Sequence, residues 1–338
     1  MAWYQVKGND QDVVFSSRIR FARNVEGFAF GKYLEEAEAK KLIDLIGNAL
    51  GDKFKRTDMQ DTSALAARAL VEQHLISRDF AAKKGPHALF RNDNQSISVM
   101  ACEEDHIRLQ CILPGLALQD AYRFVCECDD ALDAALPIAF DERLGYLTHC
   151  PTNLGTGLRA SVMLFLPALS ARGLIGSLAH ELSKLGLTIR GLYGEGSQSH
   201  GGLFQISNQV TLGLSEEEIL RKLGEAVQSI IEKERKLRTD VSEEEALRRA
   251  DRIHRAEGIA RYATLLSSEE FFSLFADLKL GVALGEITSL SHEALHAMLI
   301  HSLPATLSVQ AADVPKNGTE RDRLRATFIK QAWEVQKK

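Results

Sequence analysis

Three carboxylates stand side by side in the segment Glu103-Glu104-Asp105-His106-Ile107-Arg108. Like charges at this spacing raise each other's pKa and are costly to hold together unless a cation or a metal compensates them. The alternating run that follows, residues 107–113, predicts a strand. One interpretation is a carboxylate site for a cationic substrate, with Arg108 turned toward an anion; the other is a solvated turn.

Two arginines are spaced one residue apart in Ser16-Ser17-Arg18-Ile19-Arg20, directly after an apolar, strand-like run at residues 13–15. Because side chains in a strand repeat with period two, a strand that continues through this segment presents Arg18 and Arg20 on the same face. Two neighbouring guanidinium groups repel each other unless an anion lies between them. The alternative is a pair of exposed, solvated arginines.

Two glycine-rich segments carry further arginines. In Cys150-Pro151-Thr152-Asn153-Leu154-Gly155-Thr156-Gly157-Leu158-Arg159, two glycines allow the backbone to approach a ligand closely. The segment from Arg190 to Gly202 holds five glycines, which predicts a loop able to close over a reaction site. Neither segment is a Walker A loop or a dinucleotide fingerprint. A plain turn and a long surface loop are the respective alternatives.

Together these segments supply Arg18, Arg20, Arg108, Arg159 and Arg190. Phosphoryl transfer is catalysed mainly by positioning and by neutralising charge, so five fixed positive charges suit a nucleoside triphosphate. The net charge of −5 does not favour nucleic acid or an anionic membrane as a partner. No apolar run reaches the roughly 18–20 residues of a membrane span.

The cysteines favour a reducing compartment. Their number is odd, and only Cys126 and Cys128 lie close in sequence, so we expect free thiols in the cytoplasm and neither disulfides nor a zinc site.

Periodicity predicts a mixed fold followed by a helical one. Expected strands are residues 13–15, 96–101, 107–113 and 203–206, and expected helices are residues 34–49, 62–76, 116–136, 174–185 and 216–237. Ser215 begins the last of these as a cap ahead of three acidic residues. Strand signals nearly vanish after it, and Ser242 opens a further acid-led helix. We therefore expect an α+β domain over residues 1–237 and an all-α domain over residues 238–338.

Four ordered motifs, SSRIRFARN, CEEDHIRLQ, CPTNLGTGLRASV and RGLYGEG, resemble those of the phosphagen (guanidino) kinases. The RASVM and RGLYGE forms, and RDRLRA at residues 321–326, are similar to the bacterial branch that phosphorylates arginine in proteins. The resemblance implies a central, mostly antiparallel sheet flanked by helices. It also implies transfer of the γ-phosphoryl group of ATP to the guanidinium of protein arginines. Cys102 and His149 depart from the family pattern, which usually has Asn and a small Ser or Thr there.

The resemblance also implies roles for individual residues. Glu104 matches the catalytic base, Glu195 a second carboxylate that orients the substrate, and Cys150 a cysteine near the reacting group; Glu103, Glu104 and Glu195 would hold the guanidinium. Arg321, Asp322, Arg325 and Ala326 match an allosteric phosphoarginine site. The residues expected to bind ATP are Ser16, Ser17, Arg18, Ile19, Arg20, His74, Arg108, Arg159, Ala160, Ser161, Val162, Met163, Arg190, Gly191, Leu192, Tyr193, Gly194 and Glu195.

As partners the resemblance implies Mg²⁺ with ATP, arginine-bearing protein substrates, a second copy of the chain in a homodimer, a zinc-binding activator protein and the Clp protease of the bacterial stress response. No resident metal, nucleic acid or membrane is expected. Two alternatives stay open: a kinase for free arginine or another small guanidine, and a pseudokinase that only reads phosphoarginine.

Overall fold

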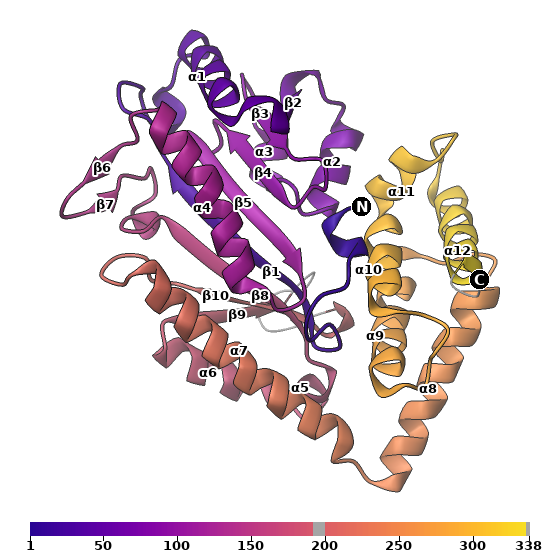
Figure 1. Cartoon of the computed structure of the whole chain (residues 1–338). Coiled ribbons are helices and arrows are strands. Elements are labelled where there is room, and N and C mark those ends of the chain that lie inside the picture. Colours follow the sequence, from indigo (N-terminus) through magenta and orange to yellow (C-terminus); the bar gives the residue numbers. More distant parts are fainter. Residues whose placement is uncertain (192–199, 336–338) are drawn as a thin grey trace.

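A single eight-stranded sheet organises the first part of the chain (Figure 1). The computed structural model describes residues 1–191 and 200–335. The strands lie in the order β2-β3-β4-β5-β1-β8-β10-β9, and every neighbouring pair is antiparallel. Their bounds are β1 Val14–Arg23, β2 Lys55–Asp58, β3 Ala88–Arg91, β4 Ile97–Ala101, β5 Ile107–Pro114, β8 Leu158–Phe165, β9 Leu187–Gly191 and β10 Leu203–Asn208. A separate hairpin pairs β6 Phe140–Asp141 with β7 Gly145–Tyr146.

The two faces of the sheet differ in chemistry because side chains alternate along each strand. Ile19 and Phe21 of β1 point into a large apolar core, as Ala160 and Val162 of β8 do. Helices cover this face, and their apolar residues complete the core: α1 Glu36–Leu50, α4 Leu118–Ala135, α5 Pro167–Ala171, α6 Ile175–Lys184 and α7 Glu216–Thr239. The helices α2 Ala64–Glu72 and α3 Arg78–Ala82 pack instead in a smaller apolar cluster with Leu89 and Met100 on the opposite face. The opposite face carries the arginines of β1.

Five further helices form the C-terminal part of the chain (Figure 1). They are α8 Glu243–Tyr262, α9 Ser268–Leu284, α10 His292–His301, α11 Pro304–Gln310 and α12 Gly318–Val335. Serine caps with side-chain hydrogen bonds open several of them, including Ser242 before α8. Such caps satisfy backbone N–H groups that a helix leaves unpaired.

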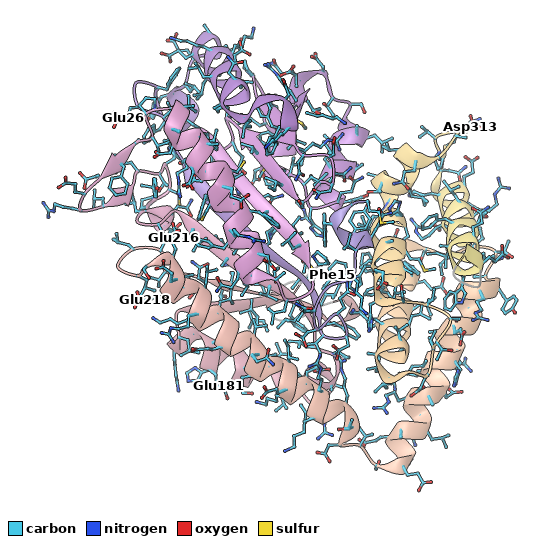
Figure 2. All side chains as sticks on the ribbon, viewed as in Figure 1. Phe15, Glu26, Glu181, Glu216, Glu218 and Asp313 are labelled. Atoms are coloured by element: carbon cyan, nitrogen blue, oxygen red, sulfur yellow. The ribbon has the colours of Figure 1, made fainter. Side chains whose placement is uncertain are left out.

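The C-terminal helices share a second apolar core with one end of the sheet. Phe15, Ile112, Met163 and Phe165 from the strands join residues of α8, α9, α10 and α12 in this core. Figure 2 labels Phe15 at this junction. Ile112 lies directly opposite Arg18 in the pairing of β1 with β5, so the helices cover the same sheet face that carries the arginines, at one end of it.

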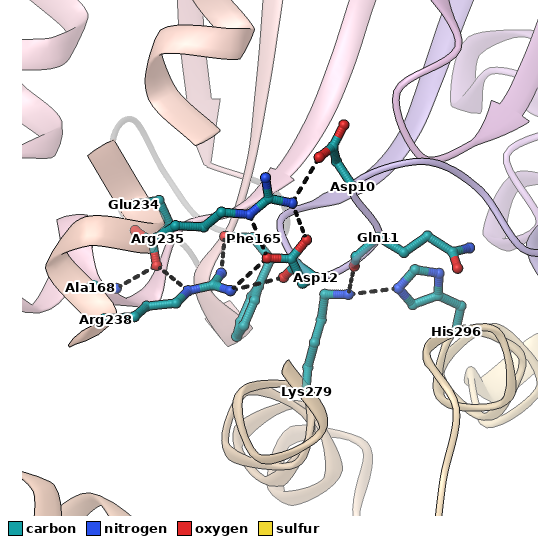
Figure 3. A network of polar contacts seen from close by, with 10 residues as sticks. All are labelled: Asp10, Gln11, Asp12, Phe165, Ala168, Glu234, Arg235, Arg238, Lys279 and His296. Carbon is teal, nitrogen blue, oxygen red and sulfur yellow. Dashed lines mark hydrogen bonds and ion pairs between the residues drawn. The ribbon is translucent and has the colours of Figure 1, made fainter. Parts of the chain in front are cut away.

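A polar network ties the C-terminal helices to α7 and the N-terminal segment (Figure 3). Lys279 of α9 donates to the backbone carbonyl of Gln11 at 2.7 Å and contacts Nε2 of His296 at 2.8 Å. Asp12 pairs with Arg235 at 2.6 Å. Because these contacts join distant segments, they fix the position of the helical group against the sheet.

Two expectations about the elements need correction. The helix expected over residues 62–76 ends at Glu72, because Gln73 caps it and His74 adopts the left-handed backbone conformation, with φ of 62°. The strand expected at residues 13–15 extends as β1 to Arg23, so Arg18 and Arg20 do lie within a strand. None of the helices in the described part of the chain is long and apolar enough to cross a membrane.

Candidate active site

The polar face of the sheet gathers arginines from adjacent strands. Arg20 of β1 lies opposite Arg159 of β8 on one side and opposite Gln110 of β5 on the other. Arg108 lies two residues before Gln110 on β5 and therefore on the same face. Arg18 lies two residues before Arg20 on β1, on the same face, and opposite Ser161 of β8. The strand register thus produces a cluster of guanidinium groups from residues that are up to 141 positions apart.

The electrostatics of this cluster favour an anion. Burial and the charges of Arg108 and Arg159 lower the pKa of Arg18 to about 10. Burial and neighbouring arginines also hold the pKa of Arg20 well below its ordinary value. The Nε atoms of Arg20 and Arg159 are buried and have no hydrogen-bond partner among the described residues. Orphaned donors are costly in a protein interior, so an anion placed here gains both charge and hydrogen bonds.

The acidic turn between β4 and β5 uses its three carboxylates differently. Glu103 is buried, and its Oε1 accepts hydrogen bonds from Ser77 and from Arg108, both at 2.7 Å. Its Oε2 accepts from the backbone N–H of Glu104 at 2.9 Å. Burial raises the pKa of Glu103, but Arg108 and these donors hold it below its ordinary value. Glu103 is therefore an ionised anchor for Arg108.

Asp105 organises the same turn. Its Oδ1 accepts from the side chain of Asn24 at 2.7 Å and from the backbone N–H of His149 at 2.6 Å. The carboxylate is buried and links the acidic turn to the loop before Cys150. This link places the loop that carries Cys150 beside the turn.

Glu104 is the uncommitted carboxylate of the three. Its side chain is exposed and makes no hydrogen bond within residues 1–191 and 200–335. Partial burial, and then the negative charges of Asp105 and Glu103, raise its pKa above the ordinary value. A free carboxylate with a raised pKa is suited to receive a guanidinium and accept a proton from it.

One cavity of about 160 Å³ brings these groups together. Glu103, Glu104, Arg20, Arg108, Arg159 and Cys150 all line it. Gly157 is required at its wall, because φ is 62° and a Cβ there would lie 2.7 Å from the carbonyl oxygen of Ala22. The thiol of Cys150 lies 3.0 Å from the hydroxyl of Thr152. Carboxylate, thiol and guanidinium groups from four separate segments therefore meet in one place.

His74 lies at a smaller recess lined also by Arg18, Ser16, Ser161, Met163 and Gln205. Burial and the charge of Arg18 lower the pKa of His74 to about 3, so its ring is neutral at physiological pH. The side-chain amide of Gln110 donates a hydrogen bond to the backbone carbonyl of His74 at 2.8 Å. Arg190 lies on β9, opposite Gln205. Burial first, and then the charges of Arg190 and Arg108, lower the pKa of Arg159.

The side chains of several residues expected to bind ATP point away from the arginine face. The side chains of Ile19, Ala160 and Val162 are in the core on the opposite face, and the Ser17 hydroxyl donates to the carbonyl of Gly115. Only their backbone lies in strands of the site. Leu192, Tyr193, Gly194 and Glu195 lie outside the described residues, and Gly191 is the last residue of β9.

Sequence reasoning missed three supporting residues: Ser77, which contacts Glu103; Asp105 as the link to His149; and Gln110, which supports His74. Side chains two residues apart in a strand share a face, so the sequence alone indicated that Gln110 lies on the same face as Arg108. No local signal pointed to Ser77, because its contact joins residues 26 positions apart.

The residues expected to form the phosphoarginine site lie on α12. Arg325 is fully buried; its Nε donates to the carbonyl of Ser302 and its Nη1 to Asp322 and the carbonyl of Leu266. Its Nη2 is buried with no partner in the described part of the chain. Arg321 is half-buried and lines a cavity of about 750 Å³ between α2, α3 and α11.

The architecture and this site define a guanidino-kinase-like phosphotransferase. The duplicated taurocyamine kinase of Schistosoma mansoni is similar in structure, with a TM-score of 0.62 and 28% identity over 70% of this chain and 36% of that chain. Lombricine kinase has the same fold, with a TM-score of 0.61 and 24% identity over 72% of this chain and 71% of that chain.

Comparison with known sequences identifies the family of phosphotransferases and the branch within it. Residues 38–237 match the ATP:guanido phosphotransferase C-terminal catalytic domain, and residues 246–338 match the protein-arginine kinase McsB C-terminal domain. The protein-arginine kinase of Desulforamulus reducens is 42% identical over 97% of this chain and 94% of its own length. That of Syntrophomonas wolfei is 43% identical over 98% and 94%. The chain belongs to the ATP:guanido phosphotransferase family, in its protein-arginine kinase branch.

Proposed function

We propose that the protein transfers the γ-phosphoryl group of ATP to the guanidinium of arginine residues in proteins. The observation that carries this function is the cavity in which the uncommitted carboxylate of Glu104 faces three arginines, Arg20, Arg108 and Arg159. A cationic acceptor and a polyanionic donor have complementary charges at adjoining walls of one site. The relatives named as protein-arginine kinases, which match nearly the whole chain, support the same activity.

The chemistry follows from these charges. A guanidinium with a pKa above 12 is a poor nucleophile because it has no free lone pair. Glu104 aligns one nitrogen with the γ-phosphorus and accepts its proton as the N–P bond forms and the bond from phosphorus to the ADP oxygen breaks. Arg20, Arg108 and Arg159 neutralise charge on the transferring group. Glu195 is proposed as an orienting partner, and Cys150 as a neighbour of the reacting nitrogen.

Mg²⁺ is proposed to enter with the nucleotide. The described residues contain no group of three or more His, Cys, Asp or Glu side chains placed to hold a metal ion. Mg²⁺ is commonly held in kinases by substrate phosphates with only one or two protein carboxylates, which is the mode proposed here. When bound, the ion would supply further positive charge to the phosphates that Arg20, Arg108 and Arg159 neutralise.

The C-terminal helices are proposed to bind phosphoarginine and to form the homodimer. The orphaned Nη2 of Arg325 and the half-buried Arg321 support a phosphoryl contact on α12. Because Arg325 also holds two backbone carbonyls, its loss would disturb folding, so Arg321 is the better position for a binding test. A cytoplasmic location, a zinc-binding activator, and marking of substrates for Clp proteolysis in the stress response complete this proposal.

The decisive experiment combines the protein with Mg·ATP and an unfolded protein, followed by mass spectrometry under non-acidic conditions. We expect phosphoarginine on the protein. Glu104→Gln should lower the rate by about 10²–10⁴-fold, the usual contribution of a general base, with ATP affinity nearly unchanged. Glu142→Gln, an exposed position outside the site, is the matched control. Wild-type activity in Glu104→Gln would remove Glu104 as the base.

The two alternatives give different results in the same assay. A small-guanidine kinase phosphorylates free arginine and leaves the unfolded protein unmodified. A pseudokinase binds phosphoarginine and forms no product with either acceptor. The ionised Glu103–Arg108 pair and the free Glu104 favour an active enzyme over a pseudokinase.

A further inference from the structure

A second cleft, of about 530 Å³, adjoins the site on another side of the acidic turn. We call it the acceptor cleft; its lining residues are Gly31, Leu34, Glu36, Ala39, Lys83, Lys84, Gly85, Pro86, Cys102, Glu103, Glu104 and His149. Glu103 and Glu104 line both this cleft and the arginine-lined cavity. Glu104 therefore lies on the boundary between the two spaces.

The position of Glu104 between the two spaces determines from which side a guanidinium-bearing acceptor must enter the site. A guanidinium held by Glu104 faces the arginines, and hence the phosphoryl group, on one side. Its aliphatic stem and main chain must extend to another side, where the acceptor cleft lies. The volume falls within the range of about 300–1,000 Å³ that drug-sized ligands occupy, so the cleft has room for residues beside the arginine.

The walls of the acceptor cleft are tied to the acidic turn itself. Lys83 donates to the backbone carbonyl of Glu103 at 2.8 Å. His149 is held through its backbone N–H by Asp105, and its ring lies against Gly31, where a Cβ would come within 2.7 Å. The cleft is therefore formed before an acceptor binds and is positioned relative to Glu104.

Lys84 places a positive charge at one wall of the cleft, whose lining also includes Lys83 and the carboxylates of Glu36, Glu103 and Glu104. The side chain of Lys84 is exposed at the turn between α3 and β3, and it makes no ion pair with any residue in the ranges the structure describes. The neighbouring Lys83 is likewise without a carboxylate partner there and is occupied by a carbonyl oxygen. An unpaired ammonium group beside the entry of a cationic side chain suits a carboxylate on the same acceptor.

We propose that the acceptor cleft binds the polypeptide around the target arginine, and that Lys84 selects an acidic residue close to that arginine. The inference rests on the protein-arginine kinase activity proposed above and specifies its acceptor. The carboxylate that Lys84 meets belongs to a neighbouring side chain; the α-carboxylate of free arginine has the same chemistry, and the experiment distinguishes the two.

The test compares arginyl peptides that differ only in the residue beside arginine: Glu, Gln or Lys. We expect kcat/KM to fall in that order, by about two- to fivefold between Glu and Gln, the effect of one exposed ion pair. The preference should shrink at high salt, because exposed charges are screened. In Lys84→Glu the order should invert, whereas Lys40→Glu, the same change on α1 outside the cleft, should keep the wild-type order.

Free arginine and N-acetylarginine amide complete the design, because only the former carries an α-carboxylate. Equal kcat/KM for the three peptides in wild-type enzyme, or an unchanged order in Lys84→Glu, overturns the inference. A Lys84-dependent preference for free arginine over the amide, without any discrimination among peptides, also overturns it. If no peptide is phosphorylated at all, the proposed function itself fails, which is a distinguishable result.

Discussion

Glu103 and Glu104 are adjacent residues of the same type whose surroundings give them different properties. Arg108, the backbone N–H of Glu104 and Ser77 hold the pKa of Glu103 below its ordinary value against the effect of burial, whereas partial burial and then like charges raise the pKa of Glu104. Pairs of titratable groups whose pKa values are pushed apart are typical of acid–base sites. The difference supports the proposal that Glu103 positions Arg108 and that Glu104 receives the acceptor.

Glu103→Gln tests this division of labour. The change keeps the shape of the side chain but removes the charge that holds Arg108 at 2.7 Å. A hydrogen bond to a charged group contributes about 1.5–3 kcal/mol, so we expect KM for ATP to rise about tenfold or more, with a smaller change in kcat. Steady-state kinetics with varied ATP and varied acceptor measures both.

The control is Glu127→Gln, at an exposed position of α4. A rise in KM for the arginine acceptor, with KM for ATP unchanged, would instead place Glu103 on the guanidinium, as the sequence resemblance predicts.

The sequence allowed the shared face of Arg18 and Arg20 to be predicted, because that prediction needs only the period of a strand. It did not allow Arg159 to be placed opposite Arg20, because pairing across the sheet depends on contacts distant in sequence. The separate environments of Glu103 and Glu104 likewise depend on Ser77 and on the conformation of the turn.

At the scale of elements, the end of α2 connects the C-terminal helices to the face of the sheet that carries the arginines. The carboxylate of Glu72 accepts from the backbone N–H groups of Ala305 and Thr306, at 2.9 and 2.6 Å, and from the Thr306 hydroxyl at 2.8 Å. It thereby caps α11. Two residues further on, His74 adopts its left-handed conformation beside Arg18.

Glu72→Ala should affect both stability and nucleotide binding. Leaving the first N–H groups of α11 without this cap should lower the free energy of unfolding by about 1–2 kcal/mol. Because His74 lies only two residues further along the chain, beside Arg18, KM for ATP should also rise, with kcat changed less. Urea unfolding and steady-state kinetics check the two effects, and Glu72→Gln, which retains one acceptor oxygen, should be intermediate.

An unchanged KM for ATP in a less stable Glu72→Ala variant would mean that Glu72 only stabilises α11 and does not affect the position of His74.

Sequence periodicity could not reveal the contact of Glu72 with α11, because the helix predicted over residues 62–76 runs through the turn at His74. The strand β8 was not predicted from the sequence. The glycines just before it and Arg159 indicated a loop, although the segment after Leu158 is apolar enough for a buried strand.

At the scale of the whole molecule, the two cores meet at the network around Lys279 (Figure 3). Lys279 is fully buried between the Gln11 carbonyl and His296, with Phe165, Asp12, His292 and Arg238 nearby. Burial first, and then the charge of Arg238, lower its pKa to about 7. The division between the domains near residue 237, which the sequence predicts from the loss of strand signals, remains a prediction, because this network and the shared core join the two sides.

The depressed pKa of Lys279 makes stability depend on pH with a defined sign. Between about pH 7 and 10 the unfolded chain keeps a proton, with a pKa near 10.4, that the folded chain has lost. Stability due to this group therefore rises with pH across that window, by at most about 1.4 kcal/mol per pH unit. As the pH is lowered from about 10 this stability is lost progressively, and the loss is complete below pH 7, where the folded protein buries an ammonium ion.

Lys279→Met tests this coupling between the two cores, because methionine fills a similar space and does not titrate. The difference in unfolding free energy, wild type minus variant, should increase by about 1–2 kcal/mol between pH 7.5 and pH 9, measured by urea unfolding. Groups common to both proteins cancel in this difference, and Lys233→Met, an exposed position on α7, should give a flat line. A flat line for Lys279→Met as well would mean that the buried amine stays protonated throughout this range, and that its partners stabilise the charge more than burial opposes it.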